Sequence, residues 1–252
     1  MTVERDAEDL IAEAAAAPVD GWGFGWLAGR ATEERPQWGY ARLVADRMAS
    51  ADAALDVDTG GGEVLAEVAR RPRLLTATEA WPPNVEVARR TLGRIGASVV
   101  AVAPDGPLPF RDASFDLVVS RHPVRTDWVQ TARVLRPGGT FLSQQIGAGT
   151  MRELSEAMLG PLPPPAQRHP EQAAAAAEAA GLRVVDLRRA TLRATFADIG
   201  AVVWFLRKVI WTVPGFTVER YRAPLGDLHR RIVDEGPFVA HAHRFLIEAT
   251  RT

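Results

Sequence analysis

One short segment constrains the fold of this chain more than any other. Residues 56–63 read Asp-Val-Asp-Thr-Gly-Gly-Gly-Glu and follow the apolar run Ala53 to Val57. A segment of helical character begins directly after them, near Gly62 or Glu63. Glycines in such a turn let the backbone approach a ligand, and the start of the helix presents unpaired N–H groups. The segment therefore predicts a strand, a ligand-binding turn and a helix in succession.

The same alternation of strand and helix continues along the first 150 residues. Further apolar strands are predicted at 74–80, 98–104, 115–122 and 140–147, with predicted helices at 84–93 and 128–134 between them. Strands that alternate with helices imply a parallel, doubly wound α/β sheet with right-handed crossovers. Such a sheet binds its ligands at the carboxyl ends of its strands.

The pattern is looser after residue 150. It predicts helices at 151–159 and 171–181 and a sixth strand at 182–190, then helices at 198–211 and 221–235 and a last strand from 237. We therefore expect an N-terminal cap over residues 1–50, a core over 51–190, a helical lid insertion over 191–236, and a final core strand over 237–252.

Acidic residues stand where three of the predicted strands end. Asp56 and Asp58 lie in the glycine turn, Glu79 closes the second strand, and Asp105 follows the third. A carboxylate at the position of Glu79 can accept both hydroxyls of a ribose, and Asp105 is placed to meet an adenine amino group. The spacing G-x-G-x-x-G, typical of nicotinamide enzymes, is absent.

Asp56, Gly60 and Gly62 match the motif D-x-G-x-G-x-G, and the turn resembles the first motif of class I S-adenosylmethionine-dependent methyltransferases. The resemblance covers roughly residues 50–147. It includes Glu79, the stretch Pro-Phe-Arg-Asp-Ala-Ser-Phe-Asp-Leu-Val at 109–118, and Val-Leu-Arg-Pro-Gly-Gly at 134–139. The two later stretches are similar to small-molecule methyltransferases related to quinone biosynthesis.

The resemblance implies a Rossmann-like, doubly wound sheet of seven mostly parallel strands, the last antiparallel, with a helical cap and lid. It also implies methyl transfer from S-adenosylmethionine, which leaves S-adenosylhomocysteine, to an oxygen, carbon or nitrogen of an unidentified small molecule. From the resemblance, and from the residues next to the matched motifs, we predict the following cofactor-binding residues: Asp56, Asp58, Thr59, Gly60, Gly62, Glu79, Asp105 and Ser120.

Asp58 departs from the motif, because it stands where the family has its first glycine. Its carboxylate would repel the carboxylate of the cofactor but attract the ammonium, and the cofactor carries a net charge of +1. We expect Asp58 to pair with the ammonium. The alternatives are a surface aspartate that tolerates an unusual backbone angle, and a degenerate site that no longer binds the cofactor.

The fourth predicted strand ends Ser120-Arg121-His122, and the resemblance places that strand end close to the methyl donor. His122 is the candidate general base, because an imidazole titrates near neutral pH; the alternative is a structural histidine bonded to the backbone. The candidate substrate-binding residues are Trp22, Trp26, Arg121, Gln144 and Trp204. We expect no metal site, since His241 and His243 lack an evident third ligand.

The amino-acid composition excludes several classes of functional site. The 252 residues contain no cysteine and carry a formal net charge of −1, which excludes thiolate metal sites and cysteine nucleophiles and disfavours a general nucleic-acid binder. The polar, acidic N-terminus does not resemble a signal peptide, and the apolar run at 200–206 is too short to span a bilayer. The lack of cysteine is compatible with a reducing cytoplasm, where we expect the protein. We expect a monomer or homodimer that binds a small molecule.

The charge is uneven along the chain. Residues 1–55 carry a balance of −5 and residues 182–236 a balance of +4, which indicates two solvated faces that attract each other, or a basic segment that meets an anionic substrate. The alternatives are an RNA methyltransferase that uses the basic 182–236 segment and a non-catalytic S-adenosylmethionine-binding protein; a nicotinamide oxidoreductase is more distant.

Overall fold

The computed structural model describes residues 6–19 and 23–252. The chain divides into two compact units. The core unit contains residues 36–148, 166–190 and 244–252, and the second unit contains residues 1–35, 149–165 and 191–243.

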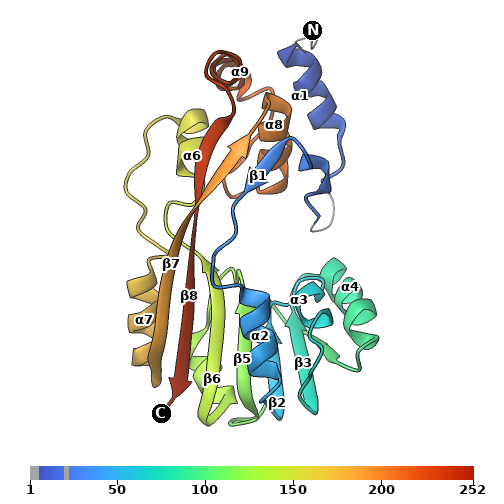
Figure 1. Ribbon diagram of the computed structural model, residues 1–252, viewed down its shortest axis with the longest axis vertical. Coiled ribbons are helices and arrows are strands. Elements are labelled where there is room, and N and C mark those ends of the chain that lie inside the picture. The colour runs from blue at the N-terminus through green and yellow to red at the C-terminus, as the bar shows by residue number, and fades with distance from the viewer. Residues whose placement is uncertain (1–5, 20–22) are drawn as a thin grey trace. The chain divides into compact units, whose positions relative to one another are not determined.

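The strands of the described residues form one sheet, in the order β1-β7-β8-β6-β5-β2-β3-β4 (Figure 1). Neighbouring strands from β4 to β6 run parallel, whereas β8 runs antiparallel to β6, and β1 to β7. The strands are β1 (Ala31–Glu33), β2 (Ala53–Val57), β3 (Leu74–Glu79), β4 (Ser98–Ala101), β5 (Phe115–Arg121), β6 (Leu135–Ile146), β7 (Leu182–Phe196) and β8 (Phe238–Arg251).

The predicted doubly wound, mostly parallel sheet with an antiparallel last strand is confirmed, but the sheet has eight strands rather than seven. The additional strand is β1, which pairs Ala31 with Phe196 of β7. It spans only three residues and shows little hydrophobic pattern, so nothing local in the sequence indicates it. Its partner region, residues 191–196, continues β7 beyond the predicted end at residue 190.

Helices cover both faces of the sheet in the core unit. One apolar cluster joins one face to α2 (Tyr40–Met48), α3 (Glu63–Ala66) and α4 (Pro82–Gly93). A second cluster joins the other face to α5 (Trp128–Val134) and α7 (Pro170–Ala179). Because β2, β3 and β5 are buried on both faces, their sequences are almost continuous apolar runs, as predicted, whereas the edge strand β4 is partly exposed.

The second unit contains the other helices of the described residues: α1 (Ala7–Ala16), the short 3-10 helix η1 (Gly25–Leu27), α6 (Arg152–Leu159), α8 (Ile199–Lys208) and α9 (Arg222–Glu235). Helix α1 packs against α8, and ion pairs join the acidic N-terminal part to the basic 182–236 segment. Asp198 pairs with Arg30, and Glu8 with Arg222. No helix of the described residues is long and apolar enough to cross a membrane.

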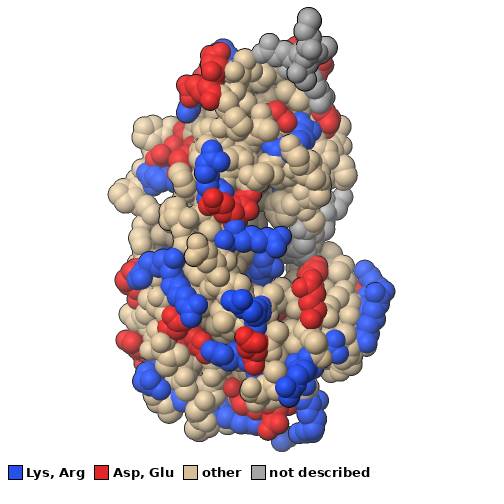
Figure 2. Space-filling view, in the orientation of Figure 1, with Lys and Arg blue, Asp and Glu red and all other residues tan. Residues whose placement is uncertain are grey.

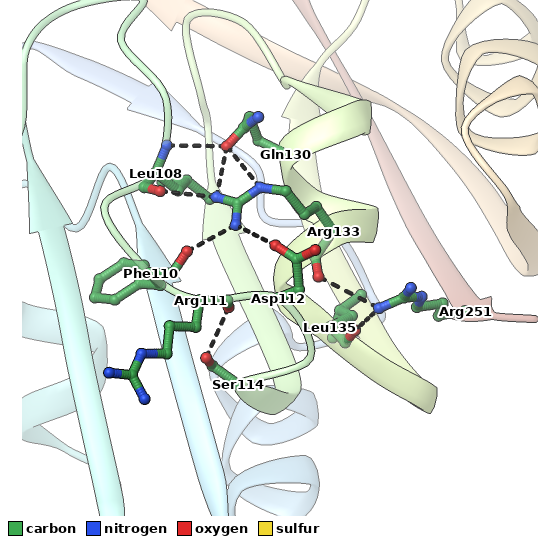
Figure 3. Close-up of polar contacts among 9 residues, drawn as sticks. All are labelled: Leu108, Phe110, Arg111, Asp112, Ser114, Gln130, Arg133, Leu135 and Arg251. Atoms are coloured by element: carbon green, nitrogen blue, oxygen red, sulfur yellow. Dashed lines mark hydrogen bonds and ion pairs between the residues drawn. The ribbon is translucent and has the colours of Figure 1, made fainter.

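One arginine organises the loop that leads into β5 (Figure 3). The guanidinium of Arg133, on α5, donates to the carbonyl oxygens of Phe110 at 2.7 Å and Leu108 at 2.8 Å. It also pairs with Asp112 at 2.8 Å and contacts the Gln130 amide oxygen at 2.8 Å. The Arg133 side chain therefore holds the stretch at 109–118 in place through Phe110 and Asp112.

We predict that Arg133→Gln lowers the free energy of unfolding by about 2–4 kcal/mol, because two backbone carbonyls and a carboxylate lose a charged donor. The matched control is Arg111→Gln, since the Arg111 side chain points away from the network in Figure 3. The control is expected to change stability by less than about 0.5 kcal/mol. Urea denaturation followed by circular dichroism measures both variants, and equal midpoints would contradict the assigned role.

Candidate functional site

The glycine turn adopts a backbone that requires glycine at its closest approach. Gly60 and Gly62 have positive φ angles of 63° and 82°. A Cβ atom on Gly62 would lie 2.6 Å from Cγ of Leu92, so a side chain there would collide with α4. Asp58 also has a positive φ, 58°, which aspartate tolerates better than most residues. The turn at the end of β2, where the sequence predicted a ligand, thus packs closely against α4 and requires glycine at position 62.

Glu79 fixes the turn to the end of β3. One carboxylate oxygen accepts from the Gly60 N–H at 2.8 Å, and the other accepts from the N–H groups of Ala80 and Trp81, both at 2.9 Å. A second tie joins the strands directly, because the Thr59 N–H donates to the Thr78 carbonyl at 3.0 Å. A carboxylate has about four acceptor positions, so Glu79 keeps acceptor capacity for a ligand hydroxyl.

Three carboxylates gather at this edge of the sheet. Burial raises the pKa of Asp56 to about 7, with further increases from Asp58 and Glu79, while the Thr59 hydroxyl lowers it. Burial and Glu79 together raise the pKa of Asp58 to about 6. Each carboxylate disfavours the charge of its neighbours, so the cluster attracts a cationic ligand.

Ser120 and Tyr40 lie next to this cluster. Ser120 is buried at the end of β5, in register with Val57, and its hydroxyl finds no partner within the described part of the chain. Burial raises the pKa of the Tyr40 phenol well above its usual range; Asp56 raises it further and Arg121 lowers it. The Tyr40 hydroxyl is therefore influenced by an acidic side and a basic side at once.

His122 belongs to a chain of three side chains. The buried Trp38 indole N–H donates to the Gln144 amide oxygen at 2.7 Å. The Gln144 amide nitrogen lies 2.8 Å from Nε2 of His122. Burial, Arg244 and Arg121 lower the pKa of His122 to about 3. The backbone N–H of His122 also donates to the Gln144 carbonyl at 2.7 Å, with His122 at a positive φ of 56°.

The strand registers place these charged residues on one face of the sheet. Asp56 lies two positions after Ala54 in β2, and Glu79 lies two positions after Ala77 in β3. In β5, Arg121 lies two positions after Val119. Side chains two positions apart share a face, and these three alanine and valine residues belong to the apolar cluster beneath α2. This face is therefore acidic at the ends of β2 and β3.

The same face is basic across β5, β6 and β8. Arg121 is in register with Gln144, and Arg244 is in register with Ile146 two positions farther along β6. Both arginines act electrostatically on His122. We call Arg121, His122 and Arg244 the basic subsite, and Asp56, Asp58 and Glu79 the acidic subsite.

The other predicted site residues have contacts of their own. The Asp105 carboxylate pairs with Arg125 at 2.9 Å, and 77% of its side chain is exposed. Trp26 and Trp204 belong to the second unit, where their rings stack at 5.8 Å and the Trp204 indole donates to the Pro18 carbonyl at 3.0 Å. Trp22 lies outside the described residues. No group of three metal-ligating side chains occurs in the described ranges 6–19 and 23–252.

Sequence reasoning took Trp38 and Tyr40 only as members of an aromatic stretch that could stack on adenine or substrate or pack a small core, and it assigned no site role to Arg244. The first two precede or begin α2 within a stretch rich in aromatic residues, where packing and function give the same signal. Arg244 reaches the site through the antiparallel pairing of β6 and β8. A single sequence contains no local pattern that indicates such a long-range pairing.

Comparison with known proteins agrees with this geometry. Residues 55–143 match the family model described as a methyltransferase domain. Among curated proteins, the malonyl-[acyl-carrier protein] O-methyltransferase of Geobacter sulfurreducens is 36% identical over 110 residues. That alignment covers 40% of this chain and 40% of the relative, so the chain spans well under half of the relative's length.

Solved structures share the fold at low identity. A putative methyltransferase from Bacillus halodurans matches with a TM-score of 0.60 and 18% identity, covering 86% of this chain and 99% of the other. Geranyl diphosphate C-methyltransferase from Streptomyces coelicolor, in complex with S-adenosyl-L-homocysteine, matches with a TM-score of 0.51 and 13% identity, covering 84% and 75%. Residues 55–143 are thus similar to a methyltransferase domain, in agreement with the resemblance in the sequence, and the solved structures share the fold.

Proposed function

We propose that this chain transfers the methyl group of S-adenosylmethionine to a small-molecule acceptor. The acidic subsite is the observation that carries the proposal. S-adenosylmethionine has a sulfonium, an ammonium and one carboxylate, and its net charge of +1 suits a site where three carboxylates repel one another. The glycine turn at the same strand end, with positive φ angles at Gly60 and Gly62, supports the same ligand.

We assign the residues as follows. Asp58 and Asp56 face the cationic groups of the cofactor, and Glu79 accepts a hydrogen bond from the ribose. The backbone of Thr59, Gly60 and Gly62 lies along the bound cofactor. The Ser120 hydroxyl, which has no hydrogen-bond partner among residues 6–19 and 23–252, supplies a further polar contact. We assign no adenine contact to Asp105, because its carboxylate pairs with Arg125 at the surface.

When bound, the cofactor supplies an activated methyl group, because sulfonium is a good leaving group. The residues of the chain align the acceptor and exclude water, which is most of the catalysis that such a transfer needs. His122 is a poor base in this structure, because its pKa is lowered to about 3 by burial and two arginines. The acceptor therefore has to arrive already nucleophilic.

A small molecule is a better substrate for this chain than RNA. Figure 2 shows Asp and Glu beside Lys and Arg over the face drawn, without one continuous basic surface. Within the basic 182–236 segment, Arg230 pairs with Asp227 and Arg188 with Asp186. The lack of cysteine suits a reducing cytoplasm, which we propose as its location, as a monomer or homodimer.

The first test is ligand-dependent thermal stability. S-adenosylmethionine and S-adenosylhomocysteine at 100 times their dissociation constants should raise Tm by about 5–10 °C, because ligand binding to the folded state stabilises it by mass action. NAD is the matched control and should leave Tm unchanged. A shift by NAD alone would overturn the proposal, and binding without turnover of any acceptor would identify a non-catalytic binder.

The second test concerns Asp58. Asp58→Asn keeps a residue that tolerates the positive φ and removes the charge, so it should weaken S-adenosylmethionine binding about 5- to 30-fold. Asp58→Gly should weaken it similarly, and Glu86→Gln on the exposed face of α4 is the control expected to bind normally. Isothermal calorimetry measures all three, and tighter binding by either Asp58 variant would contradict the ammonium contact.

The third test uses pH. Both aspartate pKa values are raised by folding, so the unfolding free energy of the ligand-free protein should fall as pH rises from about 4 to about 7. Cation binding favours the ionised carboxylates, so affinity for S-adenosylmethionine should rise at least about tenfold between pH 5.0 and 7.5. The range stops there because α-amino groups lose their proton near pH 7.7–8.0. Calorimetry across this range would refute the assignment if affinity stayed flat.

A further inference from the structure

We propose that the basic subsite binds the carboxylate of the acceptor, and that the carboxylate oxygen itself takes the methyl group to give a methyl ester. Arg121 and Arg244 face its charge, and a neutral His122 donates to it from Nδ1. This inference rests on the proposed methyl transfer and names the acceptor that the site is built to take. It is carried by a hydrogen-bond chain and by the strand register.

The hydrogen-bond chain fixes the proton on His122. An indole nitrogen only donates, so the group of Gln144 that faces Trp38 at 2.7 Å must be the amide oxygen. The amide nitrogen then faces Nε2 of His122 at 2.8 Å and donates to it. Because Nε2 accepts, a neutral imidazole carries its proton on Nδ1, and protonation of Nε2 would set two donors against each other. His122 is therefore a donor in this site.

Two arginines accompany this donor. Arg121, at the end of β5, is exposed, and none of the ion pairs among the described residues involves it. Arg244 of β8 is on the same sheet face by register and acts electrostatically on the same imidazole. Guanidinium groups match the planar oxygens of a carboxylate. A dianionic phosphate would favour a protonated histidine, which the Trp38–Gln144 pair opposes.

The acidic and basic subsites share one sheet face and meet between β2 and β5. Tyr40 marks the boundary, because Asp56 and Arg121 act on its phenol with opposite signs. A cationic methyl donor over the carboxylates and an anionic acceptor over the arginines would each be held on its own side. Two reactants of opposite charge are thereby brought together in a fixed order along the strand ends.

The chemistry balances without a base. A lone pair of the carboxylate oxygen forms the new C–O bond, and the C–S bond breaks with its electron pair going to sulfur. The products are a methyl ester and neutral S-adenosylhomocysteine, and no proton is exchanged. A carboxylic acid is ionised at neutral pH, so a site without a working base suits this acceptor and would serve an alcohol poorly.

The first experiment reads the histidine directly. Nuclear magnetic resonance of the full chain with ¹⁵N-labelled histidine and bound S-adenosylhomocysteine should show His122 as the neutral Nδ1–H tautomer from pH 5 to 8. Gln144→Glu supplies an acceptor to Nε2 and should return the His122 titration toward about pH 6.5. Trp38→Phe is a second variant that frees the amide. A wild-type His122 that carries its proton on Nε2, or titrates near pH 6.5, would overturn the donor role.

The second experiment tests the carboxylate with hexanoate and its neutral analogue hexanamide as probes. With S-adenosylhomocysteine bound, hexanoate should shift the His122 resonance and bind at least tenfold more tightly than hexanamide. Arg121→Gln and Arg244→Gln should each weaken hexanoate at least tenfold, while the surface control Arg125→Gln should not. Equal binding of the two probes would overturn the carboxylate subsite, and a preference for hexyl phosphate would replace it with a phosphate subsite.

The third experiment identifies the acceptor atom. Radiolabelled S-adenosylmethionine with hexanoate should give methyl hexanoate, recognised by release of labelled methanol in base. Hexanoate binding without this product would overturn ester formation and leave the carboxylate as a recognition group alone. Failure of S-adenosylhomocysteine to bind would overturn the proposed function itself, which calorimetry without any acceptor distinguishes.

Discussion

The contact between Glu79 and the backbone of the glycine turn is the interaction on which the site depends. Its carboxylate holds the N–H groups of Gly60, Ala80 and Trp81, and so joins the loops after β2 and β3. A buried carboxylate is stable only with such donors. This tie holds the turn that carries Asp58 close to Glu79. Burial raises the pKa values of Asp56 and Asp58, and the charge of Glu79 raises both further.

Local features of the sequence predicted the core well. Strand β2 and helix α5 have the predicted bounds, Ala53–Val57 and Trp128–Val134, because a buried apolar run and a capped helix are encoded over a few residues. Strand β1 was missed because its only support is a partner far along the chain, in the extension of β7. Strand pairing across long separations has no local sequence signal.

The candidate site shows the same division. The acidic subsite could be predicted, because Asp56, Asp58 and Glu79 stand at strand ends and strand ends meet at one edge. The role of His122 could not be predicted, because its imidazole depends on residues far away in the sequence. Gln144, which contacts it, lies 22 residues from His122, and Trp38, which holds Gln144, lies 106 residues from Gln144. The stretch at 109–118 shows a different limit of prediction from sequence. It resembles a methyltransferase motif, but in the structure Arg133 binds backbone carbonyls there and anchors the loop.

Trp38 has a consequence for how many states the site can adopt. An indole N–H gives its hydrogen bond in one direction, whereas a tyrosine or serine in its place could either give or accept. The amide of Gln144 cannot turn over while Trp38 holds its oxygen, and the imidazole cannot exchange its tautomer while the amide is held. The pattern of donors and acceptors is thus set once, when the chain folds, and an incoming ligand meets a single prepared arrangement instead of selecting one from several.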